Sequence, residues 1–360
     1  MIIQTQDYTV FLGAIDIYLA PFLQRQQYSN IAILVDENTR QYCLPYLLEV
    51  VPSLKSAVIL TITSGEQHKN IDTCAFLWQQ LLEYQFDRRS LLLNLGGGVI
   101  GDMGGFVAAT YKRGICFVQI PTTLLAQVDA SIGGKLGIDL GGIKNSVGVF
   151  QNPQAVFIDP QFLQTLPARQ LLNGFAEMVK HALIADADYW KKLQTVDISA
   201  PQSWQELIHT SLLIKKEVVE ADPLEQGLRK ILNFGHTIGH AIESYSLQYD
   251  SEPLLHGEAV ALGMIAETRL SVQQGLLPES VGTQVCNYLQ QQFPAYQIPN
   301  DAIATLTYYL QNDKKNSGQK IQSSLLQAIG NAVYDQTIGI DQIDFNRLTK
   351  ASSVENYTLF

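Results

Sequence analysis

Three of the six histidines in the chain lie within 21 residues, each next to a glycine. His236 and His240 are four residues apart, so a helix through them would place both imidazoles on one face, and His256 follows soon after. A carboxylate from another segment would complete a three-ligand metal site with an open position, and Glu177 can supply it. The alternative is a set of structural histidines in a helical core. Because three occur together without a cysteine, the pattern favours a catalytic divalent metal over a closed structural zinc site.

A run of glycines, Gly96-Gly97-Gly98-Val99-Ile100-Gly101-Asp102, follows a predicted strand and opens a predicted helix. Consecutive glycines let the backbone approach a pyrophosphate, and the helix N-terminus adds N–H donors. The spacing differs from GxGxxG, so a tight strand-to-helix turn without a ligand is the alternative. Asp36-Glu37-Asn38 ends one predicted strand, where an acidic residue can accept hydrogen bonds from ribose hydroxyls. Gly65-Glu66-Gln67-His68-Lys69 follows another predicted strand at the same edge, and a solvated turn is the alternative for each segment.

A third group of polar residues lies between the glycine run and the histidines. Three cations occur there within 33 residues, together with two hydroxyls, a carboxylate and an amide: Arg113, Lys135 and Lys144, with Thr122, Thr123, Asp129 and Asn145. Ammonium and guanidinium groups neutralise phosphate, while Asn and Asp side chains form hydrogen bonds with specific hydroxyl groups. A solvated loop is the alternative, but neighbours such as Leu124, Val128 and Ile132 are apolar. Charges in an apolar stretch need partners, and a phosphorylated, hydroxyl-rich small molecule is one.

Short apolar runs in the first 160 residues predict the scaffold for these groups. Each run is β-branched or rich in leucine and is bounded by turn residues; the predicted strands are 31–36, 57–63, 91–95 and 116–120. Helical spacing between them predicts helices over 70–86 and 102–112. Strands that alternate with helices indicate an open parallel α/β sheet, which binds ligands at the carboxyl ends of its strands.

Helical periodicity dominates after about residue 160. Apolar residues three and four apart predict helices over 168–185, 204–220, 237–245, 258–274 and 280–292, with few competing strand signals. The 360 residues are enough for two domains, with a boundary near Asp159-Pro160. We therefore expect a Rossmann-like α/β domain at 1–159 that binds a dinucleotide, and a mainly α-helical domain at 160–360 that binds metal and substrate.

Composition excludes several other classes of protein. Hydrophobic residues make up 46% of the chain and the mean hydropathy is +0.04, which is too apolar for a disordered chain. The net charge of −10 and the pI of about 5.1 argue against binding to nucleic acid. The longest uncharged run, 280–300, is rich in Gln and cannot span a membrane, and the N-terminus lacks the basic start of a signal peptide. The four cysteines are widely spaced, so we expect a soluble cytoplasmic protein with reduced thiols.

Together these motifs resemble the 3-dehydroquinate synthase family, in the family's order and over roughly residues 30–320; the matching segments are 96–102, 113–135, 144–145, 174–180, 232–243 and 255–258. The resemblance implies conversion of 3-deoxy-arabino-heptulosonate 7-phosphate into 3-dehydroquinate and phosphate, a step of the shikimate pathway to aromatic amino acids. It implies a tightly held NAD that is reduced and reoxidised within one turnover. It also implies a divalent metal, zinc with cobalt as an alternative, on Glu177, His236 and His256. His240, which spacing alone pairs with His236, is then a substrate contact.

The resemblance implies a role for other polar positions as well. Around NAD it places Asp36, Asn38, Glu66, Lys69, Gly97, Gly98, Val99, Asp102, Thr122, Thr123, Lys144, Phe162, Thr165 and Asn173. Around the substrate it places Arg113, Asp129, Lys135, Asn145, Lys180, Lys215, Arg229, Asn233, His240 and one of Lys314 and Lys315. The implied catalytic residues are Asp129, Lys135, Lys180, Glu225 and His240. Arg113 comes from the neighbouring subunit in the family, which implies a homodimer.

Three other functions fit parts of the pattern. Related cyclases act on sugar phosphates without a carboxylate, but Lys215 and Arg229 are present here to hold that group. A metal-dependent polyol or alcohol dehydrogenase of similar fold would accumulate NADH, whereas a cyclase releases phosphate without net redox change. A catalytically inactive NAD- or sugar-binding protein would bind NAD and metal but turn over no sugar phosphate.

Overall fold

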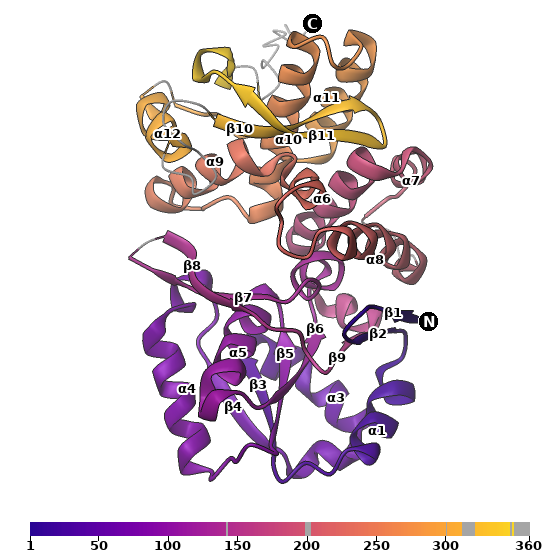
Figure 1. Ribbon diagram of the computed structural model, residues 1–360, viewed down its shortest axis with the longest axis vertical. Helices are drawn as coiled ribbons and strands as arrows, with labels where there is room; N and C mark the ends of the chain where they lie inside the picture. The colour runs from indigo at the N-terminus through magenta and orange to yellow at the C-terminus, as the bar shows by residue number, and fades with distance from the viewer. Residues whose placement is uncertain (142, 199–202, 300, 312–320, 346–347, 349–360) are drawn as a thin grey trace, which may run out of the picture. The chain divides into compact units, whose positions relative to one another are not determined.

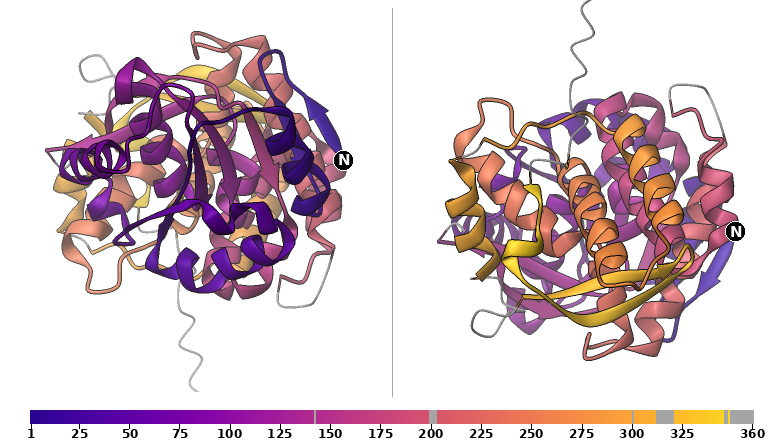
Figure 2. Two further views of the ribbon diagram at one scale, coloured as in Figure 1. Left: turned by 90° about the horizontal axis from the view of Figure 1, so that it is seen from below. Right: turned by 90° about the horizontal axis from the view of Figure 1, so that it is seen from above.

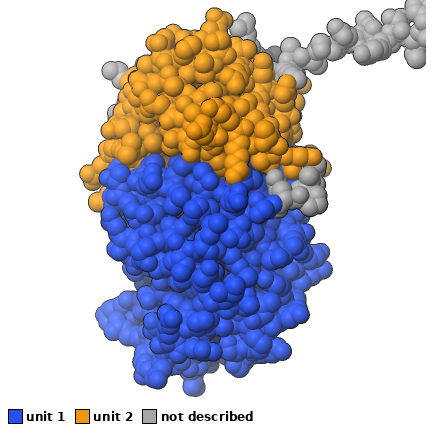
Figure 3. Space-filling view, turned by 90° about the vertical axis from the view of Figure 1, so that its right-hand side faces the viewer, with its two compact units in different colours: residues 1–175, 198–223 blue, residues 176–197, 224–360 orange. Residues whose placement is uncertain are grey.

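The chain folds into two compact units. The computed structural model describes residues 1–141, 143–198, 203–299, 301–311, 321–345 and 348 (Figure 1). Unit 1 comprises residues 1–175 and 198–223, and unit 2 comprises residues 176–197 and 224–360 (Figure 3). Within the described ranges, every helix is too short or too polar to cross a lipid bilayer.

Unit 1 is built on a seven-stranded sheet with the order β1-β2-β9-β6-β5-β3-β4 (Figure 1). The strands are β1 (Ile2–Gln4), β2 (Thr9–Leu12), β3 (Ile31–Asp36), β4 (Val58–Ile62), β5 (Leu91–Gly96), β6 (Cys116–Pro121) and β9 (Ala155–Ile158). β1 runs antiparallel to β2, and every other neighbouring pair is parallel. The four strands predicted from apolar runs are confirmed as β3 to β6, and so is their parallel pairing.

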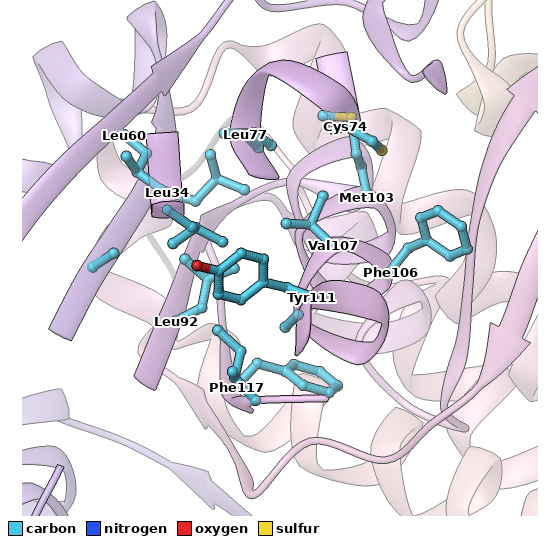
Figure 4. Packing of buried hydrophobic residues seen from close by; sticks show 14 of the residues in the cluster. Leu34, Leu60, Cys74, Leu77, Leu92, Met103, Phe106, Val107, Tyr111 and Phe117 are labelled. Atoms are coloured by element: carbon cyan, nitrogen blue, oxygen red, sulfur yellow. The ribbon is translucent and has the colours of Figure 1, made fainter. Parts of the chain in front are cut away.

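Helices cover both faces of this sheet. The helices of unit 1 are α1 (Ile15–Arg25), α2 (Glu37–Tyr42), α3 (Leu44–Val50), α4 (Ile71–Glu83), α5 (Gly98–Thr110), the first part of α6 (Ala168–Ala185) and α8 (Trp204–Ala221). Of these, α1 and α3 pack on one face of the sheet, and α4 and α5 pack on the other. Successive strand residues point to opposite faces, so Leu34 packs in one core with α4 and α5, while Ile33 packs in another with α1 and α3. Figure 4 shows the first core, which Met103 and Val107 of α5 share with Leu92 of β5.

A hairpin that the sequence pattern does not predict follows β6. It consists of β7 (Lys135–Leu140) and β8 (Ile143–Phe150), which pair antiparallel. Glycines are frequent in this segment, and glycine weakens the strand signal. The hairpin forms because Leu136 and Ile138 are buried in the same core as α4 and α5.

In the residues that the structure describes, unit 2 is helical apart from one two-stranded sheet. Its elements are the rest of α6, α7 (Ala187–Leu193), α9 (His236–Tyr249), α10 (His256–Gln273), α11 (Glu279–Gln292), α12 (Ala302–Gln311), β10 (Ile321–Ala328) and β11 (Asn331–Ile338). The helices predicted over 237–245, 258–274 and 280–292 are confirmed as α9, α10 and α11. The β10–β11 hairpin is not predicted; it packs on α10, where the Leu326 N–H donates to Ser271 Oγ (2.9 Å) (Figure 2).

A buried carboxylate ties α1 and α3 to the end of β9. Asp159 directly follows β9 and is 1% exposed. Its Oδ2 accepts hydrogen bonds from the Ile15 N–H at the start of α1 (3.0 Å) and from the Tyr46 hydroxyl of α3 (2.8 Å). Its Oδ1 accepts the Gln161 N–H (2.9 Å). One side chain thus satisfies three donors and joins elements that are far apart in the sequence.

We expect Asp159→Ala to lower the free energy of unfolding by about 2–3 kcal/mol, because it leaves the buried Ile15 N–H without its acceptor. Urea denaturation measures this change. Glu49→Ala, at an exposed position of α3, is the control and should change the free energy by less than about 0.5 kcal/mol. A loss for Asp159→Ala as small as that of the control would contradict its role.

Candidate active site

Most of the cofactor candidates in unit 1 lie at the carboxyl edge of the sheet. Four adjacent strands end there, and the candidates follow them: Asp36 ends β3, Glu66 and Lys69 follow β4, Gly97 and Gly98 follow β5, and Thr122 and Thr123 follow β6. The chain runs from β3 outward to β4 and then to β5 on the other side of β3, so the strand order reverses between β3 and β5. Open α/β sheets bind ligands in the crevice at such a reversal.

The glycine run lies where β5 passes into α5, so the predicted strand-turn-helix context is confirmed. Gly97 is the N-cap residue, and no side chain in the described part of the chain caps the N-terminus of α5. The Thr122 N–H donates to the Gly96 carbonyl (3.0 Å) and so holds the ends of β5 and β6 together. Such a helix N-terminus, with its N–H groups and the positive end of its dipole, suits an anionic group such as a pyrophosphate.

A buried lysine lies at the centre of a charged cluster at this edge. Lys69 Nζ donates to Asp102 Oδ2 (2.6 Å) and to Asn145 Oδ1 (2.6 Å). Glu66 Oε1 lies 4.0 Å from Lys69 Nζ and 3.9 Å from Lys144 Nζ. Burial alone lowers the pKa of Lys69, but Asp102 and Glu66 outweigh burial and raise the pKa above its ordinary value. The structure therefore brings four cofactor candidates together with the substrate candidate Asn145, around a lysine that is charged at neutral pH.

The other cofactor candidates of unit 1 differ in exposure. Asp36 caps α2, because its side chain accepts the Thr39 N–H (2.7 Å). Asn173 is buried in α6, where its Nδ2 donates to Gln170 Oε1 (3.1 Å). Four more candidates range from buried to exposed: Phe162 is buried, Val99 is half-buried, and Asn38 and Thr165 are exposed. Their part in cofactor binding stays a prediction.

Two substrate candidates of unit 1 form an ion pair. Asp129 lies in the π-helical turn Ala126–Ala130, and its Oδ1 is 2.7 Å from Nζ of Lys215 in α8. Lys215 is 5% exposed, and its ammonium also donates to the Asp129 carbonyl oxygen. Lys135, the first residue of β7, is exposed. The Lys215 ammonium is held in a largely dry setting, where charges interact more strongly than they do in water.

Arg113 lies at the opposite edge of the sheet from the cofactor candidates. α5 leaves the carboxyl edge at Gly98 and ends at Thr110, and Arg113 follows shortly before the amino end of β6. A helix of 13 residues is about 20 Å long, which exceeds the reach of an arginine side chain. Arg113 is exposed. Its guanidinium therefore points to solvent far from the carboxyl edge of its own sheet.

The metal candidates of unit 2 come together from three helices. Glu177 of α6 is fully buried, and its Oε1 lies 3.4 Å from Nε2 of His236 and 3.5 Å from Nε2 of His256. In a tetrahedral zinc site with bonds of about 2.0–2.1 Å, ligand atoms are about 3.3 Å apart. The separations of Glu177 from His236 and from His256 are therefore of the size expected between two ligands of one divalent metal. One nitrogen of His240 also lies within 4.8 Å of nitrogens of the other two histidines, so the geometry alone keeps His240 as an alternative ligand.

Burial and charge set opposite protonation states for two of these histidines. Burial, and then the Lys180 ammonium, lower the pKa of His236 well below its usual value, so this imidazole is neutral at pH 7. Burial also lowers the pKa of His256, but Glu243 and Glu177 outweigh burial and raise it to about 10 in the protein without metal. Lys180 is 1% exposed and forms an ion pair with Glu177. A bound divalent cation would replace the proton of His256 as a partner of Glu177.

Glu243 belongs to this cluster, although no role is predicted for it from the sequence. It lies on α9 seven residues after His236. It is 4% exposed, and its Oε2 lies 3.3 Å from Nδ1 of His256. The signal that could have identified it is its spacing, because residues i, i+4 and i+7 share one helix face and therefore place Glu243 on the same face as His236 and His240.

Close packing of α9 on α10 places these histidines. Gly235, directly before His236, has a φ of +81°, a conformation that favours glycine. A Cβ at Gly263 of α10 would lie 1.9 Å from the Gly235 carbonyl oxygen, so only glycine fits there. One turn further along α10, the buried Glu267 accepts the Gly235 N–H (2.6 Å) and the Ile238 N–H (3.4 Å). These contacts fix the start of α9, and with it His236, against α10.

The other substrate candidates of unit 2 lie just before α9. Asn233 Nδ2 donates to Glu225 Oε1 (2.7 Å), and Arg229 is 3% exposed. Glu225 and Asn233 line a hollow of about 300 Å³, together with residues of α9, β10 and β11. Lys314 and Lys315, of which one is predicted to contact phosphate, lie outside the described residues.

Both halves of the chain match models of one known family. The model described as 3-dehydroquinate synthase N-terminal matches residues 59–173, and the model described as 3-dehydroquinate synthase C-terminal matches residues 174–316. The chain belongs to the 3-dehydroquinate synthase family. A relative from Parabacteroides distasonis, a 3-dehydroquinate synthase, is 42% identical over 335 residues, which cover 91% of this chain and 94% of the relative.

Two solved synthase structures share the fold of this family member. One is 2-deoxy-scyllo-inosose synthase complexed with carbaglucose-6-phosphate, NAD+ and Co2+, with a TM-score of 0.80 at 25% identity over 95% of this chain and 98% of that chain. The other is 2-epi-5-epi-valiolone synthase from Streptomyces hygroscopicus subsp. jinggangensis with NAD+ and Zn2+ bound, with a TM-score of 0.78 at 24% identity over 94% and 95% of the two chains. The predicted fold class is confirmed.

We expect Gly263→Ala to destabilise the protein, although alanine is favoured over glycine by about 1 kcal/mol in an ordinary helix. The added Cβ would meet the Gly235 carbonyl oxygen, so the helices must separate at a cost of about 1–3 kcal/mol. The same shift should weaken zinc binding, because it moves His236 away from Glu177. Thermal unfolding and zinc titration measure the two effects. A variant that matches the wild type in both would show that the helix contact does not set the site.

Proposed function

We propose that the chain is a 3-dehydroquinate synthase, which converts 3-deoxy-arabino-heptulosonate 7-phosphate into 3-dehydroquinate and phosphate. The observation that carries the proposal is the fit of Glu177, His236 and His256 to one divalent metal, in a chain that belongs to this family. Both reacting ends of this substrate belong to one molecule. Positioning by the protein is therefore a large part of the proposed catalysis.

We propose that NAD binds at the carboxyl edge of the sheet in the domain of residues 1–159, with further contacts from Phe162, Thr165 and Asn173. Its pyrophosphate would lie at the N-terminus of α5 beside Gly97 and Gly98, where the N–H groups and the positive end of the helix dipole favour an anion. Asp36 ends β3, where a carboxylate can accept hydrogen bonds from a ribose. When bound, NAD supplies reversible hydride transfer, so the reaction needs no net oxidant.

We propose that residues 160–360 hold the metal, on Glu177, His236 and His256. Two imidazoles and a carboxylate form a donor set that zinc accepts, and cobalt takes similar ligands. When bound, the metal supplies Lewis acidity that lowers the pKa of a substrate hydroxyl. His240, whose ring centroid lies 5.1 Å from that of His236, is then proposed to contact the substrate.

The proposed substrate contacts suit a molecule with both a carboxylate and a phosphate. Lys215 and Arg229 are proposed to hold the carboxylate, which an arginine can bind through two parallel hydrogen bonds. The carbaglucose-6-phosphate in the solved synthase structure has no such group. The other proposed contacts carry charge or amide groups that suit phosphate and hydroxyls: Asp129, Lys135, Asn145, Lys180, Asn233, His240 and one of Lys314 and Lys315.

Five side chains are proposed to exchange protons or hold developing charge: Asp129, Lys135, Lys180, Glu225 and His240. The carboxylate of Asp129 is fixed by Lys215 (2.7 Å), and that of Glu225 is fixed by Asn233 (2.7 Å). A carboxylate held in this way can exchange a proton at a defined atom. The departing phosphate carries negative charge, which the ammonium groups of Lys135 and Lys180 would neutralise.

Phosphate release from 3-deoxy-arabino-heptulosonate 7-phosphate tests the proposed function. The assay uses substoichiometric NAD, with and without a chelator, and we expect many turnovers per NAD and loss of activity on chelation. Sedoheptulose 7-phosphate, which lacks the carboxylate, should release none. Turnover of sedoheptulose 7-phosphate alone would indicate another sugar phosphate cyclase. Accumulation of NADH would indicate a dehydrogenase. Binding of NAD without turnover of either sugar phosphate would indicate an inactive binding protein.

Metal content separates the two possible ligand sets. We expect Glu177→Ala to lose zinc, because removal of one of three protein ligands destroys the site. His240→Ala should retain zinc, because its imidazole is proposed to contact the substrate instead. Zinc per chain is measured after dialysis. Zinc retained in Glu177→Ala but lost in His240→Ala would support the pair that spacing alone suggests, His236 and His240.

We propose a homodimer in which Arg113 completes the site of the neighbouring subunit. The position of Arg113 at the far edge of its own sheet supports this arrangement, because the side chain is remote from the carboxyl edge of that sheet.

We also propose a cytoplasmic location for the protein. The four cysteines are free thiols, which supports this location.

Mixed dimers test the position of Arg113. Arg113→Ala and Glu177→Ala should each be inactive alone. When both are expressed together, about half of the dimers are mixed, and each mixed dimer has one intact site if Arg113 acts across the interface. We therefore expect about a quarter of wild-type phosphate release in the mixture. Activity no higher than that of the two parents would show that Arg113 acts in its own subunit.

A further inference from the structure

One buried carboxylate beside the proposed metal ligands has no assigned role. Glu243 of α9 is 4% exposed, and its Oε2 lies 3.3 Å from Nδ1 of His256. The other ring nitrogen of this histidine, Nε2, lies 3.5 Å from Glu177 Oε1. The His256 ring is therefore held between two carboxylates, one at each nitrogen.

These two contacts determine which nitrogen of His256 faces the proposed metal. A neutral imidazole carries its proton on one nitrogen and a lone pair on the other. If Glu243 accepts the proton of Nδ1, the lone pair is on Nε2 and faces Glu177. A carboxylate partner also makes the imidazole a more basic metal ligand.

His236 has the same arrangement with a different acceptor. Its Nδ1 lies 3.2 Å from the Phe234 carbonyl oxygen, and its Nε2 lies 3.4 Å from Glu177 Oε1. The backbone therefore orients one histidine, whereas a side chain orients the other. This side chain comes from the helix that also carries His236, so α9 supplies both a ligand and the group that orients the ligand of α10.

We propose that Glu243 is a positioning residue of the metal site: it accepts the Nδ1 proton of His256 and so directs Nε2 toward Glu177. It acts through His256 and is not itself a ligand. The inference rests on the proposed metal site of Glu177, His236 and His256. Partners of this kind typically change metal affinity 10–100-fold when they are removed.

Two substitutions of Glu243 test this role. Glu243→Gln keeps the volume and one acceptor oxygen but removes the charge, and Glu243→Ala removes both. In competition with a chromophoric chelator, we expect zinc affinity to fall about tenfold in Glu243→Gln and about a hundredfold in Glu243→Ala. The visible spectrum of the Co2+-loaded protein, which reports coordination geometry, should also change in Glu243→Ala.

Ser271→Ala is a matched structural control in α10. Ser271 is buried, donates to the Glu267 carbonyl (2.6 Å) and accepts the Leu326 N–H (2.9 Å), but none of these partners is a proposed ligand. This variant should unfold at a lower temperature and yet bind zinc within about twofold of the wild type. If the role of Glu243 were merely structural, Glu243→Ala would likewise unfold at a lower temperature and still bind zinc within about twofold of the wild type.

Each remaining outcome decides a separate claim. Zinc affinity within about twofold of the wild type in Glu243→Gln and Glu243→Ala, at one zinc per chain, overturns the role of Glu243 but leaves the metal site standing. Absence of zinc binding in the wild type, or unchanged affinity in Glu177→Ala, overturns the metal site itself. If circular dichroism shows that Glu243→Ala is unfolded, the isosteric Glu243→Gln decides the matter alone.

Discussion

The contact between α9 and α10 is the constraint on which the proposed metal site depends. His236 is the first residue of α9 and His256 the first residue of α10, so the distance between the two imidazoles is set by how the helices pack. Gly263 lets the backbones approach, and Glu267 holds the start of α9 by its N–H groups. Protein interiors are tightly packed and transmit small displacements. One methyl group in this contact would therefore displace the histidines at both helix starts.

Charge compensation is the second requirement of both units. A buried charge is costly unless it is paired, and the fully buried Glu177 is surrounded by Lys180 and His256. In unit 1, Lys69 is in the same situation beside Asp102. Each unit thus holds opposite charges together where a charged ligand is proposed to bind. A bound metal or pyrophosphate would join a network of charges that is already fixed in place.

The sequence predicts the central strands β3 to β6 and most of the long helices, and it misses the short strand β9 and the β7–β8 and β10–β11 hairpins. β5 is buried at every residue, and α6 has a clear apolar stripe, so both are found with nearly correct ends. The β7–β8 and β10–β11 hairpins are missed because glycine, serine and glutamine weaken the alternation of apolar and polar residues in their strands. The residues that orient the histidines are missed for another reason: Glu267 meets Gly235 only through helix packing, which a local pattern does not reveal. Glu243 is different, because its spacing from His236 does place it on the ligand face.

The central claim is that one metal binds to Glu177, His236 and His256. Anomalous diffraction from crystals of the zinc-loaded protein, recorded at the zinc absorption edge, tests it most directly. The account predicts one peak per chain, about 2.0–2.2 Å from a carboxylate oxygen of Glu177 and from Nε2 of both histidines. A peak held by His236 and His240 without Glu177, or a zinc ion bound elsewhere in the chain, would contradict it.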